Sequence, residues 1–302
     1  GKPVRNYDPN KGIESPTDVV YRLMIDWDEY EKKTKLTDRL AQFLDDPASS
    51  QVPALILGIW EGQFEMTGGS APLAAAMVEA SERLPKLKAL FFGDLQQEEC
   101  EISWIMQTDI SALLEAYPQL EVFGVRGNEG LSLGALKNEN LRELAIETGG
   151  LSGKVVREVA AAELPNLEHL ELWLGTDEYG GDATLTDLAP ILSGKQFPKL
   201  RYLGLRDSAM ADEIAEAIAA TDLLKTIEIL DLSLGALTDR GALALSSSPG
   251  VDQLKLLDIH HHFVSENMVA KLKNLGISVN AKDRQEEDVY GDEVYRYIAV
   301  SE

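Results

Sequence analysis

The chain has 302 residues, of which 44% are hydrophobic and 26% charged, the profile of a folded soluble protein. Its 51 acidic and 28 basic residues give a net charge of −23, which repels the phosphates of nucleic acids and the surface of anionic membranes. We therefore expect neither nucleic acid nor membrane as a partner. The same charge serves either solubility alone or the attraction of a basic protein, and both interpretations stay open.

Cysteine content and apolar runs bear on the cellular compartment. Cys100 is the one cysteine, so no intrachain disulfide can form and nothing points to an oxidising environment. The longest apolar run, residues 53–60, is too short to cross a membrane. Residues 1–5 lack the apolar core of a signal peptide. We therefore expect a cytoplasmic protein.

The first 51 residues carry no copy of the pattern that follows them. Residues 19–27 alternate well enough to form a strand, and residues 36–44 form an amphipathic helix that Asp45, Asp46 and Pro47 end. A repeat array must cover the exposed edge of its core at each end. We therefore assign residues 1–51 to an N-terminal capping region.

From residue 52 onward, one six-residue pattern recurs eight times: L-x-x-L-x-L, with aliphatic or aromatic substitutes. The copies are residues 52–57, 87–92, 120–125, 141–146, 167–172, 200–205, 227–232 and 254–259. Four of them follow an aromatic residue or leucine and then a proline: Pro85, Pro118, Pro165 and Pro198. A proline there ends the preceding helix and forces an extended approach to a strand.

Segments with apolar residues at helical spacing lie between these copies, and several open with a capping serine or threonine. They are residues 71–84, 109–117, 153–164, 187–192, 211–224, 239–246 and 266–275. Each unit is then a short strand followed by a helix. Stacked in parallel, such units predict an α/β leucine-rich-repeat horseshoe solenoid, with a parallel concave sheet and convex helices, over residues 52–281.

The chain after the last repeat is acidic. Residues 283–293 are expected to form a mobile linker, and residues 294–300 are a strand candidate. We therefore assign residues 282–302 to an acidic linker and a C-terminal tail strand.

Residues 232–245, LSLGALTDRGALAL, resemble the ribonuclease-inhibitor class of leucine-rich repeats, and Asn128 matches the asparagine of that class. Ser208 and Gly235 stand at that position in other copies, a departure from the class consensus. The whole chain is also similar to an uncharacterised group of bacterial cytoplasmic leucine-rich-repeat proteins, for example in residues 45–49 and 260–262. These resemblances imply the fold and a bacterial origin, and they imply no reaction.

Residues between the core leucines of each strand alternate onto the open concave face. The first three repeat strands present mostly small and apolar residues there, whereas the later strands present aromatic residues and arginine among acids. The candidate protein-binding residues are Glu147, His169, Glu171, Trp173, Tyr202, Arg206, Asp231, Asp258 and His260. This composition is typical of protein-binding hot spots, although any exposed sheet carries mixed polar residues.

Three details of this face follow from the strand positions. Trp173 and Arg206 occupy the same position of consecutive strands, so we expect them to be neighbours. Gly204 is expected to leave room beside Tyr202 for a side chain of the partner. Residues Glu171, Asp231 and Asp258 are expected to form a negative stripe that attracts lysine or arginine.

The leading functional hypothesis is a non-catalytic intracellular scaffold that binds a protein on its concave face. The alternative is an enzyme that uses the Glu, Asp and His cluster of the later strands, with or without a metal. No phosphate loop, dinucleotide fingerprint or nucleophile elbow is present in the sequence, so we expect no catalytic residues and no cofactor. Residues 260–262 are three consecutive histidines, but neighbouring strand residues point in opposite directions, so we expect no metal site there.

Overall fold

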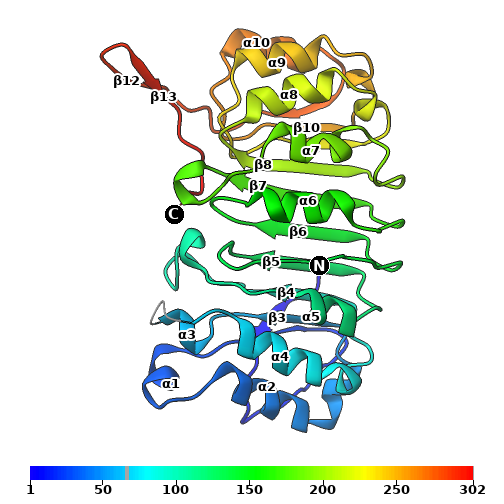
Figure 1. The fold of residues 1–302 in the computed structure, drawn as a ribbon, viewed down its shortest axis with the longest axis vertical. Helices are drawn as coiled ribbons and strands as arrows, with labels where there is room; N and C mark the ends of the chain where they lie inside the picture. Colours follow the sequence, from blue (N-terminus) through cyan, green and yellow to red (C-terminus); the bar gives the residue numbers. More distant parts are fainter. Residues whose placement is uncertain (65–67, 302) are drawn as a thin grey trace. The chain divides into compact units, whose positions relative to one another are not determined.

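The computed structural model describes residues 1–64 and 68–301. By its contacts the chain divides into two compact units, each described by itself below. Unit 1 consists of Gly1–Leu144 and Ala162–Leu164, and unit 2 consists of Ala145–Ala161 and Pro165–Glu302. In both units, parallel strands follow one another in chain order and helices pack against the sheet (Figure 1).

Among the described residues of unit 1, five strands are hydrogen-bonded to one another in parallel. They are β1 (Val4–Asn6), β2 (Val20–Leu23), β3 (Ala54–Leu57), β4 (Ala89–Phe92) and β5 (Val122–Arg126). Its helices are α1 (Trp27–Glu31), α2 (Leu36–Asp45), α3 (Glu61–Phe64), α4 (Ala71–Glu79) and α5 (Ser111–Ala116). Strand β6 (Glu143–Glu147) follows, at the point where the contacts divide the chain.

Unit 2 repeats the same arrangement. Its parallel strands are β7 (His169–Gly175), β8 (Tyr202–Ser208), β9 (Ile229–Asp231), β10 (Leu256–Asp258) and β11 (Ser278–Asn280). Its helices are α6 (Gly153–Ala161), α7 (Leu185–Leu192), α8 (Ala211–Ala219), α9 (Asp239–Ser246) and α10 (Glu266–Lys273). A separate antiparallel hairpin is formed by β12 (Asp288–Tyr290) and β13 (Glu293–Tyr295).

The core of unit 2 is a ladder of leucines. Leu170, Leu203, Leu230 and Leu257 are in register on β7 to β10, and each is fully buried. Because side chains alternate along a strand, the residues between these leucines point to the other face of the sheet, away from the helices. We call that second face the open face. The predicted leucine ladder is confirmed.

The predicted α/β leucine-rich-repeat fold is confirmed. Each of the eight copies contains one strand, from β3 to β10, and the helices follow the strands as expected. The strand expected within residues 19–27 is β2, whereas β1 in unit 1 and β11 in unit 2 are parallel strands that were not predicted. The division at residues 51 and 281 stays a prediction. Within the described residues, no helix has the length and apolar content needed to span a bilayer.

The tail differs from the expected linker and strand. The segment 283–293, expected as a linker, contains the strand β12. Of the expected strand 294–300, only residues 294 and 295 are in a strand, β13, which pairs with β12. The reason is the two-residue turn at Gly291 and Asp292, where the φ of +65° at Gly291 suits a tight hairpin. The chain then returns to unit 2, where the Ile298 side chain is buried.

Candidate functional site

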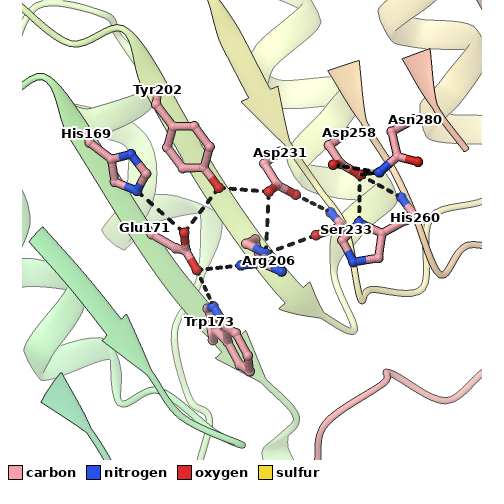
Figure 2. A network of polar contacts seen from close by, with 10 residues as sticks. All are labelled: His169, Glu171, Trp173, Tyr202, Arg206, Asp231, Ser233, Asp258, His260 and Asn280. Atoms are coloured by element: carbon pink, nitrogen blue, oxygen red, sulfur yellow. Dashed lines mark hydrogen bonds and ion pairs between the residues drawn. The ribbon is translucent and has the colours of Figure 1, made fainter. Parts of the chain in front are cut away.

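A network of polar side chains lies on the open face of unit 2 (Figure 2). The register of β7, β8 and β9 places its members side by side. We call it the Arg206 network, and it comprises His169, Glu171, Trp173, Tyr202, Arg206, Asp231 and Ser233. All seven residues were expected on this face from the strand positions, and all but Ser233 were candidate binding residues.

The Arg206 network contains two stacked pairs of side chains. The Arg206 guanidinium lies 5.0 Å from the centre of the Trp173 ring system, and the two residues are directly opposite each other on neighbouring strands. The rings of His169 and Tyr202 lie 3.8 Å apart and are inclined by only 3°. The predicted neighbourhood of Trp173 and Arg206 is therefore confirmed.

Glu171 is the acceptor that joins the two stacks. Its carboxylate accepts hydrogen bonds from Trp173 Nε1 (2.7 Å) and Arg206 Nη1 (2.6 Å), and His169 Nε2 lies 3.5 Å away. The Tyr202 hydroxyl shares its one proton between Glu171 (3.1 Å) and Asp231 (2.7 Å). Burial raises the pKa of Glu171, but the hydrogen bonds from His169, Trp173 and Arg206 outweigh burial and bring the pKa to about 2. Glu171 is therefore ionised at neutral pH.

Asp231 is the second acceptor of the Arg206 network. It accepts hydrogen bonds from the Tyr202 hydroxyl (2.7 Å) and from the backbone N–H of Ser233 (2.9 Å), and it lies 3.5 Å from Arg206 Nε. Burial and then the charges of Asp231 and Glu171 raise the pKa of Tyr202. Burial lowers the pKa of Arg206, but the same two carboxylates raise it overall. Tyr202 is therefore protonated and Arg206 charged at neutral pH.

The structure corrects one expectation about this face. A Cβ at Gly204 would lie 3.0 Å from Tyr202 Cε1 and 3.3 Å from Glu171 Cγ, so the Tyr202 ring itself fills the space expected for a partner. Arg206 lies between Glu171 and Asp231, and its single positive charge offsets only one of the two carboxylates. The attraction of the stripe Glu171, Asp231 and Asp258 for lysine or arginine stays a prediction.

A second polar cluster lies beside the Arg206 network. Asp258 is opposite Asp231 on one side and Asn280 on the other. Asn280 Nδ2 donates to both Asp258 oxygens (3.0 and 2.9 Å), and His260 Nδ1 lies 2.7 Å from one of them. Burial raises the pKa of Asp258, but hydrogen bonds from His260 and Asn280 lower it overall. Asn280 was missed because β11 lies beyond the last copy of the repeat and has only three residues, too few to show an alternation.

The three consecutive histidines follow β10 and lie in a turn, where His261 has a φ of +56°. The three imidazole rings therefore point in different directions because of this turn, and not because side chains alternate along a strand. His262 is buried and its Nδ1 accepts a hydrogen bond from the backbone N–H of Val264 (2.9 Å), whereas the His261 ring reaches the Tyr297 carbonyl (3.1 Å). In the part of the chain that the structure describes, no three His, Cys, Asp or Glu side chains are arranged to hold a metal ion.

Glu147, the remaining candidate, is half-buried at the end of β6. Its place in a binding surface stays a prediction.

Unit 1 contains a buried, ion-paired arginine that was not predicted from the sequence. Arg22 lies on β2, with Nε 2.9 Å from Asp94 and Nη2 2.9 Å from Glu99. It was overlooked because β2 lies in the segment assigned as a cap. Arg126 on β5 is 3.8 Å from the same Asp94 and lies over the Phe91 ring. Unit 1 therefore has its own ion-paired cluster.

Comparison with known proteins places the chain in a family. No family model and no curated protein matches it. Among solved structures it matches a protein from Bacteroides fragilis, determined as a structural genomics target, with a TM-score of 0.84. It also matches an internalin from Listeria monocytogenes, with a TM-score of 0.43 and 14% identity over 82% of this chain and 57% of that chain. With 31% identity over 94% of its own length and 78% of the other, the chain belongs to the same family as the Bacteroides fragilis protein.

Proposed function

We propose that the chain is a non-catalytic scaffold that binds another protein on the open face of unit 2, centred on the Arg206 network. The observation that carries this proposal is that Trp173, Tyr202 and Arg206 are held in fixed orientations by Glu171 while they remain partly accessible. Tryptophan, tyrosine and arginine dominate binding energy at protein interfaces. Side chains that are already ordered lose less conformational entropy on binding, which favours affinity.

The ionisation states of the Arg206 network favour a binding role over a catalytic one. General acid–base catalysis at neutral pH needs a group whose pKa lies near 7. Glu171 is far below that range, and the pKa values of Tyr202 and Arg206 are raised above their ordinary, already high values. These three groups therefore present fixed charges and fixed donors, which suits recognition.

The partner is a protein, and the net charge of −23 favours a basic one because opposite charges accelerate association. Since Arg206 offsets part of the charge of Glu171 and Asp231, we expect the net charge of the chain to act mainly on the rate of encounter with a basic partner. The contact itself would rest on the partly accessible side chains of Trp173 and His169.

Crosslinking tests the proposal in cells that produce the protein. The photo-crosslinking residue benzoylphenylalanine would replace Trp173 in one variant and Leu243 in another. Leu243 is the control position because it is exposed on helix α9, which is not part of the open face of the sheet. A partner captured from position 173 alone would be purified and its affinity measured. Trp173→Ala should then weaken binding at least tenfold, whereas Leu243→Ala should not. Capture from position 243 alone, or an unchanged affinity for Trp173→Ala, would place the surface elsewhere.

One observation favours a second candidate, an enzyme. Asp258 contacts Nδ1 of His260, and a carboxylate that orients an imidazole in this way is a common arrangement for a general base. His260 is half-buried on the face that would receive a substrate. An activity found against a substrate panel and abolished by both His260→Ala and Asp258→Asn would support this candidate over the scaffold.

A further inference from the structure

The β12–β13 hairpin, residues 288–295, projects away from the other elements of unit 2 in Figure 1. It is nevertheless fixed at its base. Before the hairpin, the backbone N–H of Gln285 donates to the His262 carbonyl (2.8 Å). After it, Ile298 is buried and the Val300 N–H donates to Asp207 Oδ1 (3.0 Å). The hairpin is therefore an arm anchored on both sides.

Both faces of this arm carry uncovered apolar side chains. Val289 and Val294 are opposite each other on one face, and the rings of Tyr290 and Tyr295 lie 6.0 Å apart on the other. These four side chains are 40% to 68% exposed. A two-stranded hairpin alone is only marginally stable in water, and exposed apolar clusters mark sites of interaction. The hairpin thus has the features of an element completed by a partner.

The outer edges of the hairpin are open to a third strand. Among the described residues its sheet has only two strands. Tyr290 and Glu293 flank the two-residue turn and form the hydrogen-bonded pair next to it. The following pair, Val289 and Val294, is then the pair whose N–H and C=O groups point outward. An extended peptide that pairs with these groups would add a strand to the hairpin.

Charge indicates what kind of strand would bind. Residues 282–302 contain seven acids and three bases, and one of the bases, Arg296, is paired with Glu287 at 2.6 Å. A second copy of the chain would bring the same acidic segment against this one, which costs electrostatic energy. A segment with lysine or arginine complements the acids, and aliphatic residues complement Val289 and Tyr290.

We propose that the β12–β13 hairpin is a docking arm to which an extended segment of another protein, alternating aliphatic and basic residues, adds as a third strand. This surface is separate from the Arg206 network and does not rest on the function proposed for it. Strand addition supplies main-chain hydrogen bonds, and the alternating side chains supply selectivity.

The first experiment uses the unaltered full chain and labelled synthetic peptides, with binding followed by fluorescence anisotropy at physiological salt. An alternating valine–lysine peptide should bind saturably. The same peptide methylated at every backbone nitrogen keeps its charge but loses the backbone donors of both edges, and it should bind at least tenfold more weakly. An alternating valine–glutamate peptide should not bind. Equal binding of the N-methylated peptide would show attraction by charge alone and overturn the proposal.

Variants then locate the contact. Val289→Pro and Val294→Pro each remove one outward N–H and keep the bonds inside the hairpin, so one of them should weaken binding at least tenfold. The double variant Asp292→Asn/Glu293→Gln should also weaken it. Its control, Asp252→Asn/Glu266→Gln, makes the same change of charge elsewhere in unit 2 and should not. Full binding by both proline variants, or a hairpin-dependent dimer in sedimentation, would overturn the proposal.

Discussion

Asp207 accepts a hydrogen bond from the backbone N–H of Val300, a residue 93 positions later in the chain. The other carboxylate oxygen of Asp207 is buried without a hydrogen-bond partner, and the backbone has a φ of +49°. Burial raises the pKa of Asp207 to about 7, although the Val300 N–H and the charge of Arg206 act to lower it. The folded protein therefore holds a proton on Asp207 more tightly than the unfolded chain does.

This relationship predicts a pH dependence of stability. Because the folded pKa is raised from 3.8, the stabilisation is complete below about pH 3.8 and is lost as the pH rises through about 7. Asp207→Asn removes the titrating group and tolerates the left-handed backbone. It should raise the free energy of unfolding at pH 8 by about 1–3 kcal/mol relative to the wild type. Denaturant titrations at pH 5 and pH 8 measure this, and an identical pH dependence in both proteins would contradict it.

Glu171 predicts the opposite dependence. Its pKa in the folded protein, about 2, lies below the ordinary 4.5, so its contribution to stability is present above 4.5 and is lost as the pH falls toward 2. Glu171→Gln should reduce this acid sensitivity and cost about 1–3 kcal/mol at pH 7, because Arg206 loses its nearest carboxylate. The check is denaturation of both proteins between pH 2 and 7. Parallel curves would mean that the Glu171 contacts are too weak to matter.

The leucine ladder predicts a large effect of truncation. Leu203 is fully buried between Leu170 and Leu230, so Leu203→Ala should cost about 2–5 kcal/mol in the free energy of unfolding. The matched control is Leu243→Ala on α9, where the side chain is 47% exposed and the change should be within about 0.5 kcal/mol. Equal destabilisation by the two substitutions would argue against the ladder as the core.

The three consecutive histidines predict no bound transition metal. Their rings have different backbone surroundings, and Nδ1 of His262 already accepts a hydrogen bond from the Val264 N–H. Elemental analysis of tag-free protein should give far less than one zinc or iron ion per chain. One equivalent of metal that disappears in His260→Ala would refute this expectation.

The strands of the repeats were predictable because each buried leucine recurs at a fixed place. The open-face positions of Trp173 and Arg206 followed from alternation. The placement of the Arg206 guanidinium between Glu171 and Asp231 did not follow, because it depends on which way each side chain turns. Sequence alone could not show that Tyr202 would turn over Gly204.

Short elements outside the repeat were harder to predict. Strands β1 and β11 have three residues each, too few to show a periodicity. The hairpin had a recognisable signal, since Gly291 and Asp292 separate two segments that each end in Val-Tyr, but the surrounding acids favoured a linker. The net charge of a segment bears on its solubility and does not prevent two strands within the segment from pairing.

The contact between Val300 and Asp207 can form only late in the synthesis of the chain. The strand β8 leaves the ribosome well before Val300, whose N–H donates to Asp207 near the end of that strand. Until residue 300 has emerged, Asp207 Oδ1 lacks this hydrogen bond. The last contact of β8 therefore forms only after the tail of the chain has been synthesised.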